Sequence, residues 1–385
     1  MNQMTPIHDA GELRKIVNSL TEFSKLTLEE IKTLDPYLYY SPTMFELEVE
    51  HLWSKEWILV GHVAQVKKPG DYFAFDFLSE PMIIVRGKDM RIRAVSSVCQ
   101  HRFMPLVRHN DRGSVSRFTC PYHLWSFGLD GQLLGATYME EHKCFNRKDV
   151  KLPEYRLEVW NDLIFINLDD EAAPLAPRLK PIEQRMSVFK VPDNYVTCQH
   201  HDDVWDVNWK FVVENNENYH SSAIHPNTVN LGSPTHMYRA DLAEHGEGYC
   251  SAFWGAPADR PRAGRPVPGY AGEEVLELCT VFPMGTLSVM PDSVSIYPYW
   301  PISAEKTRIT ALALSHPDDV NQEWEEDHSK SFINTFLAED YSAVGGGLQW
   351  AVKSKKQKAG MCSNQEEMVL RVHQHSAKVI LDAIG

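Results

Sequence analysis

The segment from Cys99 to Trp125 contains two motifs that each pair one cysteine with one histidine, Cys99-x-His101 and Cys120-x-x-His123. Thiolates and imidazoles at such short spacing bind zinc or the iron of iron–sulfur clusters. A zinc finger usually takes two cysteines from one arm and two histidines from the other, whereas here each arm is mixed. A cluster of two irons and two sulfides, with cysteines on one iron and histidines on the other, requires mixed arms from two facing loops. The pattern therefore favours such a cluster over zinc or no metal.

The residues around these motifs have the pattern of an antiparallel β-domain. The runs "WILVGHVAQV", "DYFAFDFL", "PMIIVRG" and "RIRAVSSV" are rich in β-branched and aromatic residues, and "KKPG", "LSE" and "KDM" separate them. "NDLIFINL", residues 161–168, ends this section. We therefore expect a small β-domain at residues 45–165, with both metal motifs inside it.

Helices and strands are mixed in the remainder of the chain. The expected helices are 8–34, 41–57, 320–344 and 364–383. Ser41 and the proline after it begin the second helix. A proline-rich connector, residues 169–181, follows the β-section. The predicted organisation is a small β-domain inserted into a larger α+β domain, which comprises residues 1–44 and 166–385.

Charge and composition argue against several classes of protein. The formal net charge of −14 argues against nucleic-acid binding, which requires clustered lysine and arginine. The densest basic run, Lys353–Lys358, is expected to be a solvated surface. No stretch reaches the roughly 18 apolar residues that span a bilayer, and the N-terminus lacks a signal-peptide pattern. Seven scattered cysteines indicate reduced thiols in a cytoplasmic protein.

A second candidate metal motif is Glu217-x-x-His220-x4-His225. Glu217 and His220 would share one face of a helix. His220 and His225 would point about 140° apart on an unbroken helix, so both can face one metal only if the helix ends between them. Two serines follow His220 and a proline follows His225, which favours that end. Two histidines and one carboxylate with open positions are typical of ferrous enzymes that activate oxygen.

A buried acid is predicted in the segment "SFINTFLAEDYSAV". Its apolar stripe recurs every four residues and consists of Phe332, Phe336, Asp340 and Val344. An acid among aromatics is costly unless it is paired or bound to metal, so Asp340 is a stronger candidate ligand than Glu339, which faces outward. The glycines at 345–347 are expected to end this helix.

Together these motifs resemble the Rieske non-haem iron oxygenases. The matching pieces are "CQHR", "CPYHLW", "NWK", "EN" and "ENYHSSAIHP", in the family's order and over nearly the whole chain. The resemblance implies the terminal oxygenase (alpha) subunit. It also implies a small antiparallel-β Rieske domain inserted into a helix-grip-like catalytic domain with a curved antiparallel sheet and C-terminal helices.

The resemblance implies a role for each candidate residue. The [2Fe–2S] ligands would be Cys99, His101, Cys120 and His123. The ligands of a mononuclear Fe(2+) would be His220, His225 and Asp340. Glu217 would be the catalytic bridge, which carries electrons from the Rieske domain of a neighbouring subunit, through His123, to the mononuclear site. Phe103 and Leu124 stand where the family usually has glycine, and one residue is missing between "EN" and Glu217, which leaves the place of Asn215 open.

The resemblance also implies partners. Oxygen would be the cosubstrate, and electrons from NAD(P)H would arrive through a separate ferredoxin or flavin reductase. No glycine-rich nucleotide fingerprint precedes a helix, so the chain itself is not expected to bind NAD(P)H. Transfer between subunits implies a homotrimer.

The substrate is the least constrained property. The glutamate bridge and the His-Pro pair resemble the oxygenases of quaternary ammonium compounds, which hydroxylate beside nitrogen and cause N-dealkylation. Six aromatics could cage a cation: Tyr249, Phe253, Trp254, Tyr297, Tyr299 and Trp300. The alternative is an oxygenase that hydroxylates or dealkylates aromatic compounds. Further alternatives are a Rieske electron carrier without oxygenase chemistry and a di-iron helical bundle built on Glu-x-x-His pairs, which the β-strand pattern disfavours.

Overall fold

The computed structural model describes residues 10–385 except 140, 189–194, 218–219, 225–240, 247, 256–274, 284, 290–293, 319 and 321–336. The chain forms two compact units, Leu59–Leu175 and the combination of Met1–Ile58 with Ala176–Gly385. One unit is therefore inserted into the other, and the predicted fold class is confirmed. The two compact units meet near residues 58 and 175, and the helices before residue 58 pack on helices of the larger unit.

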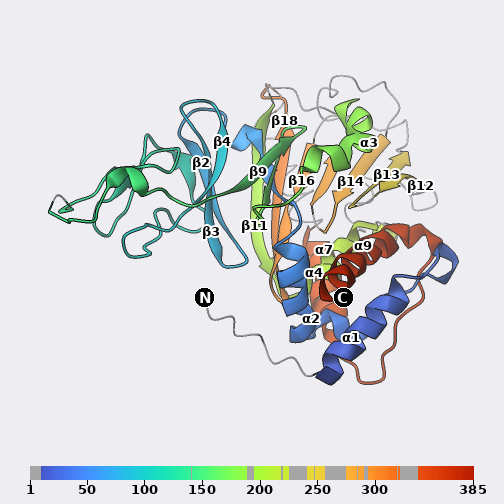
Figure 1. The fold of residues 1–385 in the computed structure, drawn as a ribbon. Coiled ribbons are helices and arrows are strands. Elements are labelled where there is room, and N and C mark those ends of the chain that lie inside the picture. The colour runs from blue at the N-terminus through green and yellow to red at the C-terminus, as the bar shows by residue number, and fades with distance from the viewer. Residues whose placement is uncertain are drawn as a thin grey trace. The chain divides into compact units, whose positions relative to one another are not determined.

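The smaller unit is built on an antiparallel sheet of seven strands in the order β1-β10-β9-β4-β3-β2-β5 (Figure 1). These strands are β1 (Ile58–His62), β2 (Asp71–Phe77), β3 (Glu80–Arg86), β4 (Ile92–Ser96), β5 (Arg112–Ser114), β9 (Glu154–Trp160) and β10 (Leu163–Asn167). A second sheet contains β6 (Phe118–Thr119), β7 (Ser126–Phe127) and β8 (Leu133–Gly135). Both cysteines of the metal motifs belong to the core between them, beside Val95 and Phe127.

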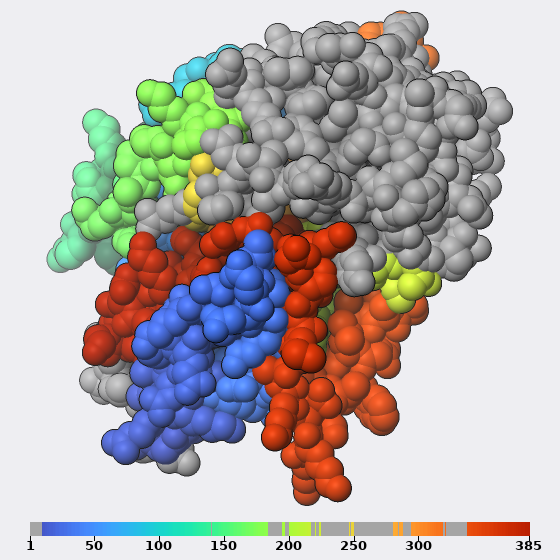
Figure 2. Space-filling model, turned by 90° about the vertical axis from the view of Figure 1, so that its right-hand side faces the viewer, coloured from blue at the N-terminus to red at the C-terminus, as the bar shows by residue number. Residues whose placement is uncertain are grey.

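The larger unit contains an antiparallel sheet in the order β11-β18-β16-β15-β14-β13-β12, with β17 paired to β18. The strands are β11 (Val196–Trp205), β12 (Asp241–Gly246), β13 (Tyr249–Gly255), β14 (Val275–Val281), β15 (Thr286–Val289), β16 (Val294–Tyr297), β17 (Tyr299–Ser303) and β18 (Lys306–Ser315). The helix α9 (Glu367–Ile384) contacts β12, β13 and the helix α1 (Ala10–Phe23), so it lies between the sheet and α1. Figure 2 shows α1, in blue, against the red C-terminal residues.

The N-terminal helices are more broken than predicted. α1 ends at Phe23, and short 3-10 turns, η1 (Leu28–Glu30) and η2 (Pro36–Tyr39), follow it. The helix expected at 41–57 consists of α2 (Pro42–Leu47) and a π-helical turn, η3 (Glu48–Trp53). The hydroxyl of Ser41 accepts a hydrogen bond from the Met44 N–H at 3.1 Å, which confirms the predicted start.

The glycines at 345–347 do not end their helix, so that prediction was wrong. α7 (Leu337–Ala343) continues through a π-helical turn, η10 (Val344–Leu348), into α8 (Gln349–Ala351). Val344 and Gln349 are buried on either side of the glycines. The Gln349 side chain also accepts a hydrogen bond from the Asn208 N–H at 2.7 Å. This packing stabilises a helical backbone at residues 345–347, which glycine on its own disfavours.

Among the helices that the structure describes, none is long and apolar enough to cross a membrane.

Within the larger unit, a buried cluster joins Glu56, which follows η3, to Arg178 and to His375 of α9. Glu56 accepts a hydrogen bond from Arg178 at 2.6 Å, and its other oxygen lies 2.8 Å from the His375 Nε2. Burial raises the pKa of Glu56, but the His375 hydrogen bond and the Arg178 charge outweigh it and lower that pKa from 4.5 to about 2.

The Glu56 cluster predicts a specific acid sensitivity. Because the folded pKa is depressed, the stabilisation is complete above pH 4.5 and is lost as the pH falls towards 2. The shift corresponds to about 3 kcal/mol. Urea unfolding across this pH range should show that Glu56→Gln is less stable than the wild type at pH 6 and that the gap narrows in acid. A constant gap would contradict the assignment.

Candidate metal centres

The two Cys/His arms form matching turns. Cys99 N–H donates to the Met104 carbonyl at 2.9 Å, and the Phe103 N–H donates back to the Cys99 carbonyl at 3.1 Å. The second arm repeats this, since the Cys120 N–H donates to the Trp125 carbonyl at 2.7 Å and the Leu124 N–H to the Cys120 carbonyl at 3.1 Å. Both arms therefore present a thiol and an imidazole in the same way.

The two thiols are neighbours and the two imidazole rings are neighbours, an arrangement that fits a Rieske cluster. Cys99 and Cys120 are each 1% exposed, and burial, followed by the neighbouring Cys120 thiol, raises the pKa of Cys99. The rings of His101 and His123 lie 4.7 Å apart between centroids. The Nδ1 atoms of both rings are buried and have no hydrogen-bond partner among the described residues. A buried ring nitrogen without a partner is costly unless it binds a metal.

The two departures from the family pattern occupy left-handed backbone positions. Phe103 has φ of 60° and Leu124 has φ of 61°. Glycine adopts this conformation without strain, whereas a residue with a Cβ does so at a cost. Both side chains project outward, with 83% and 65% of their surface exposed. The substitutions therefore leave the ligand turns intact but strain them.

Replacing Phe103 by glycine is expected to stabilise the smaller unit by about 1 kcal/mol, because it removes left-handed strain and few contacts. Leu124→Gly should act similarly. Thermal unfolding measures the change, and Leu129→Gly, at a buried position, is the control that should destabilise. A clear loss of stability in Phe103→Gly would show that its side chain has contacts worth more than the strain.

The second motif follows a helix that tightens into a 3-10 turn. α4 (Trp209–Glu214) passes into a 3-10 turn, η6 (Asn215–Glu217), and a new helix, α5 (Ser221–Ile224), begins after His220. The Ala223 N–H donates to the His220 carbonyl at 2.8 Å, so His220 caps α5. α5 is described as far as Ile224, so the predicted helix end between His220 and His225 stays a prediction. His225 lies outside the described residues.

His220 and Asp340 meet across the larger unit. Asp340 is 3% exposed on α7, which confirms its predicted burial, and Glu339 is less buried. The Asp340 Oδ1 lies 3.6 Å from the His220 Nε2. Donor atoms at this distance can share one ion at metal–ligand distances of about 2.0–2.2 Å. Two of the three predicted ligands thus fit a mononuclear site.

Asn215 takes part in this site, although the missing residue had left its place open. Its amide donates to the Asp340 Oδ1 at 2.7 Å. Asn215 therefore belongs to the candidate site as a hydrogen-bond donor to a predicted ligand.

The aromatic residues proposed as a cation cage separate into different environments. Tyr249, Tyr299 and Trp300 are at most 3% exposed, and Tyr299 is bonded to the Asn216 amide, so these three pack inside the fold. Tyr297 differs, because burial and the nearby Asp340 charge raise its pKa. The side chains of Phe253 and Trp254 lie outside the described part. Of the cage candidates whose side chains the structure describes, Tyr297 alone is half-buried rather than buried.

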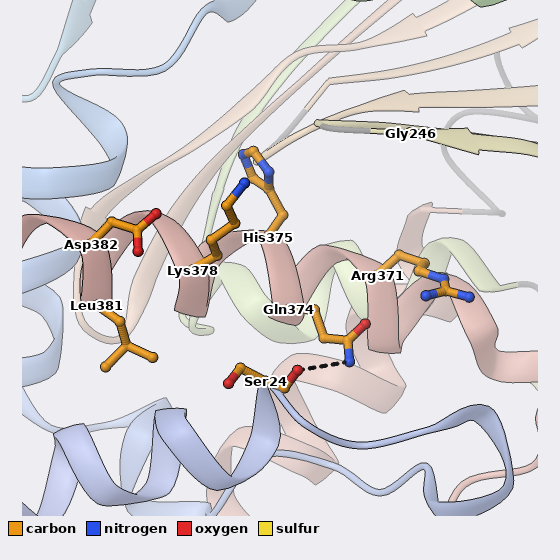
Figure 3. Close-up of a pocket in the computed structure, with 8 residues that line it drawn as sticks. All are labelled: Ser24, Gly246, Arg371, Gln374, His375, Lys378, Leu381 and Asp382. Atoms are coloured by element: carbon orange, nitrogen blue, oxygen red, sulfur yellow. Dashed lines mark hydrogen bonds between the residues drawn. The ribbon is translucent and has the colours of Figure 1, made fainter.

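A cavity of about 610 Å³ lies elsewhere, beside α9 (Figure 3). Two of its basic residues are already engaged, because Arg371 pairs with Glu367 and His375 with Glu56. Gln374 donates to the Ser24 carbonyl at 3.3 Å. No predicted ligand lines this cavity.

Within the described residues, no group of three or more Cys, His, Asp or Glu side chains surrounds one ion. Each iron of a Rieske cluster takes only two protein ligands, and the mononuclear site would need His225.

Two family models match the chain. Residues 56–154 match the Rieske [2Fe-2S] domain, and residues 192–382 match the ring hydroxylating alpha subunit (catalytic domain). Together with the two metal centres, they define an iron–sulfur and mononuclear-iron oxygenase. The chain belongs to the Rieske non-haem iron oxygenases and is an alpha subunit of that family. Its cofactors are a [2Fe–2S] cluster and a mononuclear iron.

Relatives in this family act on different substrates. The alpha subunit of benzene 1,2-dioxygenase from Pseudomonas putida is 28% identical over 88% of this chain and 82% of its own length. The oxygenase subunit of carnitine monooxygenase from Acinetobacter pittii is 31% identical over 50% of this chain and 53% of its own.

Solved structures show the same fold. A quaternary ammonium Rieske monooxygenase in complex with an inhibitor has a TM-score of 0.80 at 22% identity, covering 94% of this chain and 98% of that one. Naphthalene 1,2-dioxygenase from Rhodococcus sp. has a TM-score of 0.79 at 19% identity. The match covers 97% of this chain and 99% of that one.

Proposed function

We propose that this oxygenase hydroxylates a quaternary ammonium compound beside nitrogen, which leads to N-dealkylation. The contact of His220, Asp340 and Asn215 carries the assignment of an iron site. The substrate class is supported by the glutamate bridge, the His-Pro pair and the identity with the carnitine monooxygenase subunit.

In this proposal each group has one task. Cys99, His101, Cys120 and His123 hold the cluster. His220, His225 and Asp340 hold the iron, which supplies the site where O2 is reduced. The Asn215 amide fixes the Asp340 carboxylate, as a hydrogen-bond donor beside a metal ligand commonly does. Glu217 links the two centres between subunits.

Electrons would come from a separate ferredoxin or flavin reductase, with NAD(P)H as their source. The bridge implies a homotrimer. The scattered cysteines support a cytoplasmic location.

Hydroxylation of an aromatic compound is the second candidate. The dioxygenase alpha subunits resemble this chain over most of its length, which favours it.

A substrate screen distinguishes the two candidate functions, oxidation of a quaternary ammonium compound and hydroxylation of an aromatic compound. The loaded protein, with a surrogate reductase, should convert a betaine or carnitine to an aldehyde and a smaller amine, and product formation should match NADH consumption. Conversion of an aromatic acid or hydrocarbon, with no betaine product, would replace the proposal by the second candidate. NADH loss alone is insufficient, because oxygen can be reduced without substrate turnover.

A further inference from the structure

A partly buried carboxylate, Glu214, joins three elements beside the candidate iron site. Glu214 ends α4, directly before Asn215, whose amide bonds Asp340. The Tyr39 hydroxyl donates to the Glu214 Oε1 at 2.6 Å, and the His373 Nε2 lies 2.6 Å from the same oxygen. Tyr39 is 2% exposed in η2 and His373 is 1% exposed in α9. The sequence had indicated no functional role for either residue.

The protonation states of this cluster follow from its contacts. Burial, and then the Glu214 charge, raises the pKa of Tyr39. The phenol therefore keeps its proton and donates a hydrogen bond to Glu214. Because one carboxylate oxygen receives both contacts, the His373 Nε2 must carry a hydrogen and donate as well. Two donors from opposite ends of the chain therefore fix the Glu214 side chain.

Fixing Glu214 also fixes the residues after it. Side chains on a 3-10 turn project about 120° apart, so neighbours point in different directions. Glu214 points to Tyr39 and His373, Asn215 points to Asp340, and Asn216 donates to Thr286 at 2.7 Å. The orientation of Asn215 is therefore set by anchors on both sides.

We infer that Tyr39 and His373, acting through Glu214, are positioning residues that hold the Asn215 amide on Asp340. The inference rests on the proposed iron site. It means that α9 and the N-terminal turn η2 support the orientation of a metal ligand.

The chain offers a matched control on the same helix. His375 also bonds a buried carboxylate, Glu56, but no residue beside Glu56 bonds Asp340 among the described contacts. His373→Phe and His375→Phe each remove one imidazole from α9 at similar volume. Their stabilities are measured by urea unfolding, and their mononuclear iron by retention during dialysis against a chelator.

His373→Phe should retain iron about tenfold less well and lower kcat per bound iron, with KM little changed, while the cluster spectrum stays intact. His375→Phe should lose stability but keep iron retention. Glu214→Gln should remain near the wild type, because the amide oxygen accepts both hydrogen bonds, whereas Glu214→Leu should match His373→Phe. Tyr39→Phe keeps the ring stacked on Phe211 and should show a smaller loss in the same direction.

Equal iron loss in both histidine variants, or wild-type retention in His373→Phe, would overturn the inference. Failure of the proposed iron site gives a different result, since the wild type would then retain no mononuclear iron at all.

Discussion

Asp340→Ala is expected to abolish turnover and leave the cluster spectrum unchanged. Asp340 is buried, lies 3.6 Å from the His220 Nε2 and accepts a hydrogen bond from the Asn215 amide. Removing a residue that supports a ligand commonly costs 10–100-fold in metal affinity or activity. Loss of a ligand itself should exceed the upper end of that range, so activity should fall by well over about 100-fold.

Neighbouring variants make this prediction specific. Glu339→Ala changes the adjacent acid, which is less buried, and should retain activity. Asn215→Ala should lose an intermediate amount, about 10–100-fold, because the carboxylate remains but loses its donor. Iron analysis should show that Asp340→Ala keeps the iron of the cluster and lacks the additional iron. Wild-type iron content and turnover in Asp340→Ala would remove this residue from the ligand set.

Glu48→Ala is expected to destabilise the larger unit by about 3–5 kcal/mol. Glu48 and Lys210 are each 1% exposed and form an ion pair at 2.5 Å. The second Glu48 oxygen accepts a hydrogen bond from the Trp209 Nε1 at 2.9 Å. Removing the carboxylate leaves a buried ammonium without its counter-charge and an indole without its acceptor.

A double variant tests the cause of that loss. Glu48→Met with Lys210→Met removes both charges and should recover much of the stability that Glu48→Ala loses. Asp206→Ala breaks the exposed pair with Lys306 and should cost less than about 1 kcal/mol. Urea unfolding measures all three. If the double variant were as unstable as Glu48→Ala, the buried charge would not be the cause.

This pair also explains the "NWK" motif in physical terms. The Asn208 side chain accepts from the Lys210 N–H at 3.0 Å and caps α4, while the Lys210 side chain binds Glu48. The motif therefore starts and anchors the helix that ends at Glu214 and leads to Asn215.

The features that the sequence predicted correctly depend on local chemistry. The mixed Cys/His arms and the strand pattern around them need only neighbouring residues, and Ser41 caps a helix through Met44. The burial of Asp340 followed from its spacing to apolar residues. The ligand roles of the two Cys/His arms, His220, His225 and Asp340, and the bridging role of Glu217, stay predictions.

The features that the sequence did not predict depend on distant contacts. Asn215 bonds a residue 125 positions away, and Lys210 one 162 positions away. The 3-10 turn after Glu214 and the helix through the glycines at 345–347 are held by such tertiary contacts. Local propensity, which had predicted that the helix stops at the glycines, was outweighed there.

The central claim is that this chain holds two different iron centres. Its most direct test is the iron and acid-labile sulfide content of the purified protein, together with that of Cys120→Ser and Asp340→Ala. The account predicts two cluster irons and two sulfides plus one further iron in the wild type. Cys120→Ser should lose the sulfide, and Asp340→Ala only the further iron. A colourless zinc protein without sulfide, or sulfide without any additional iron that depends on Asp340, would contradict it.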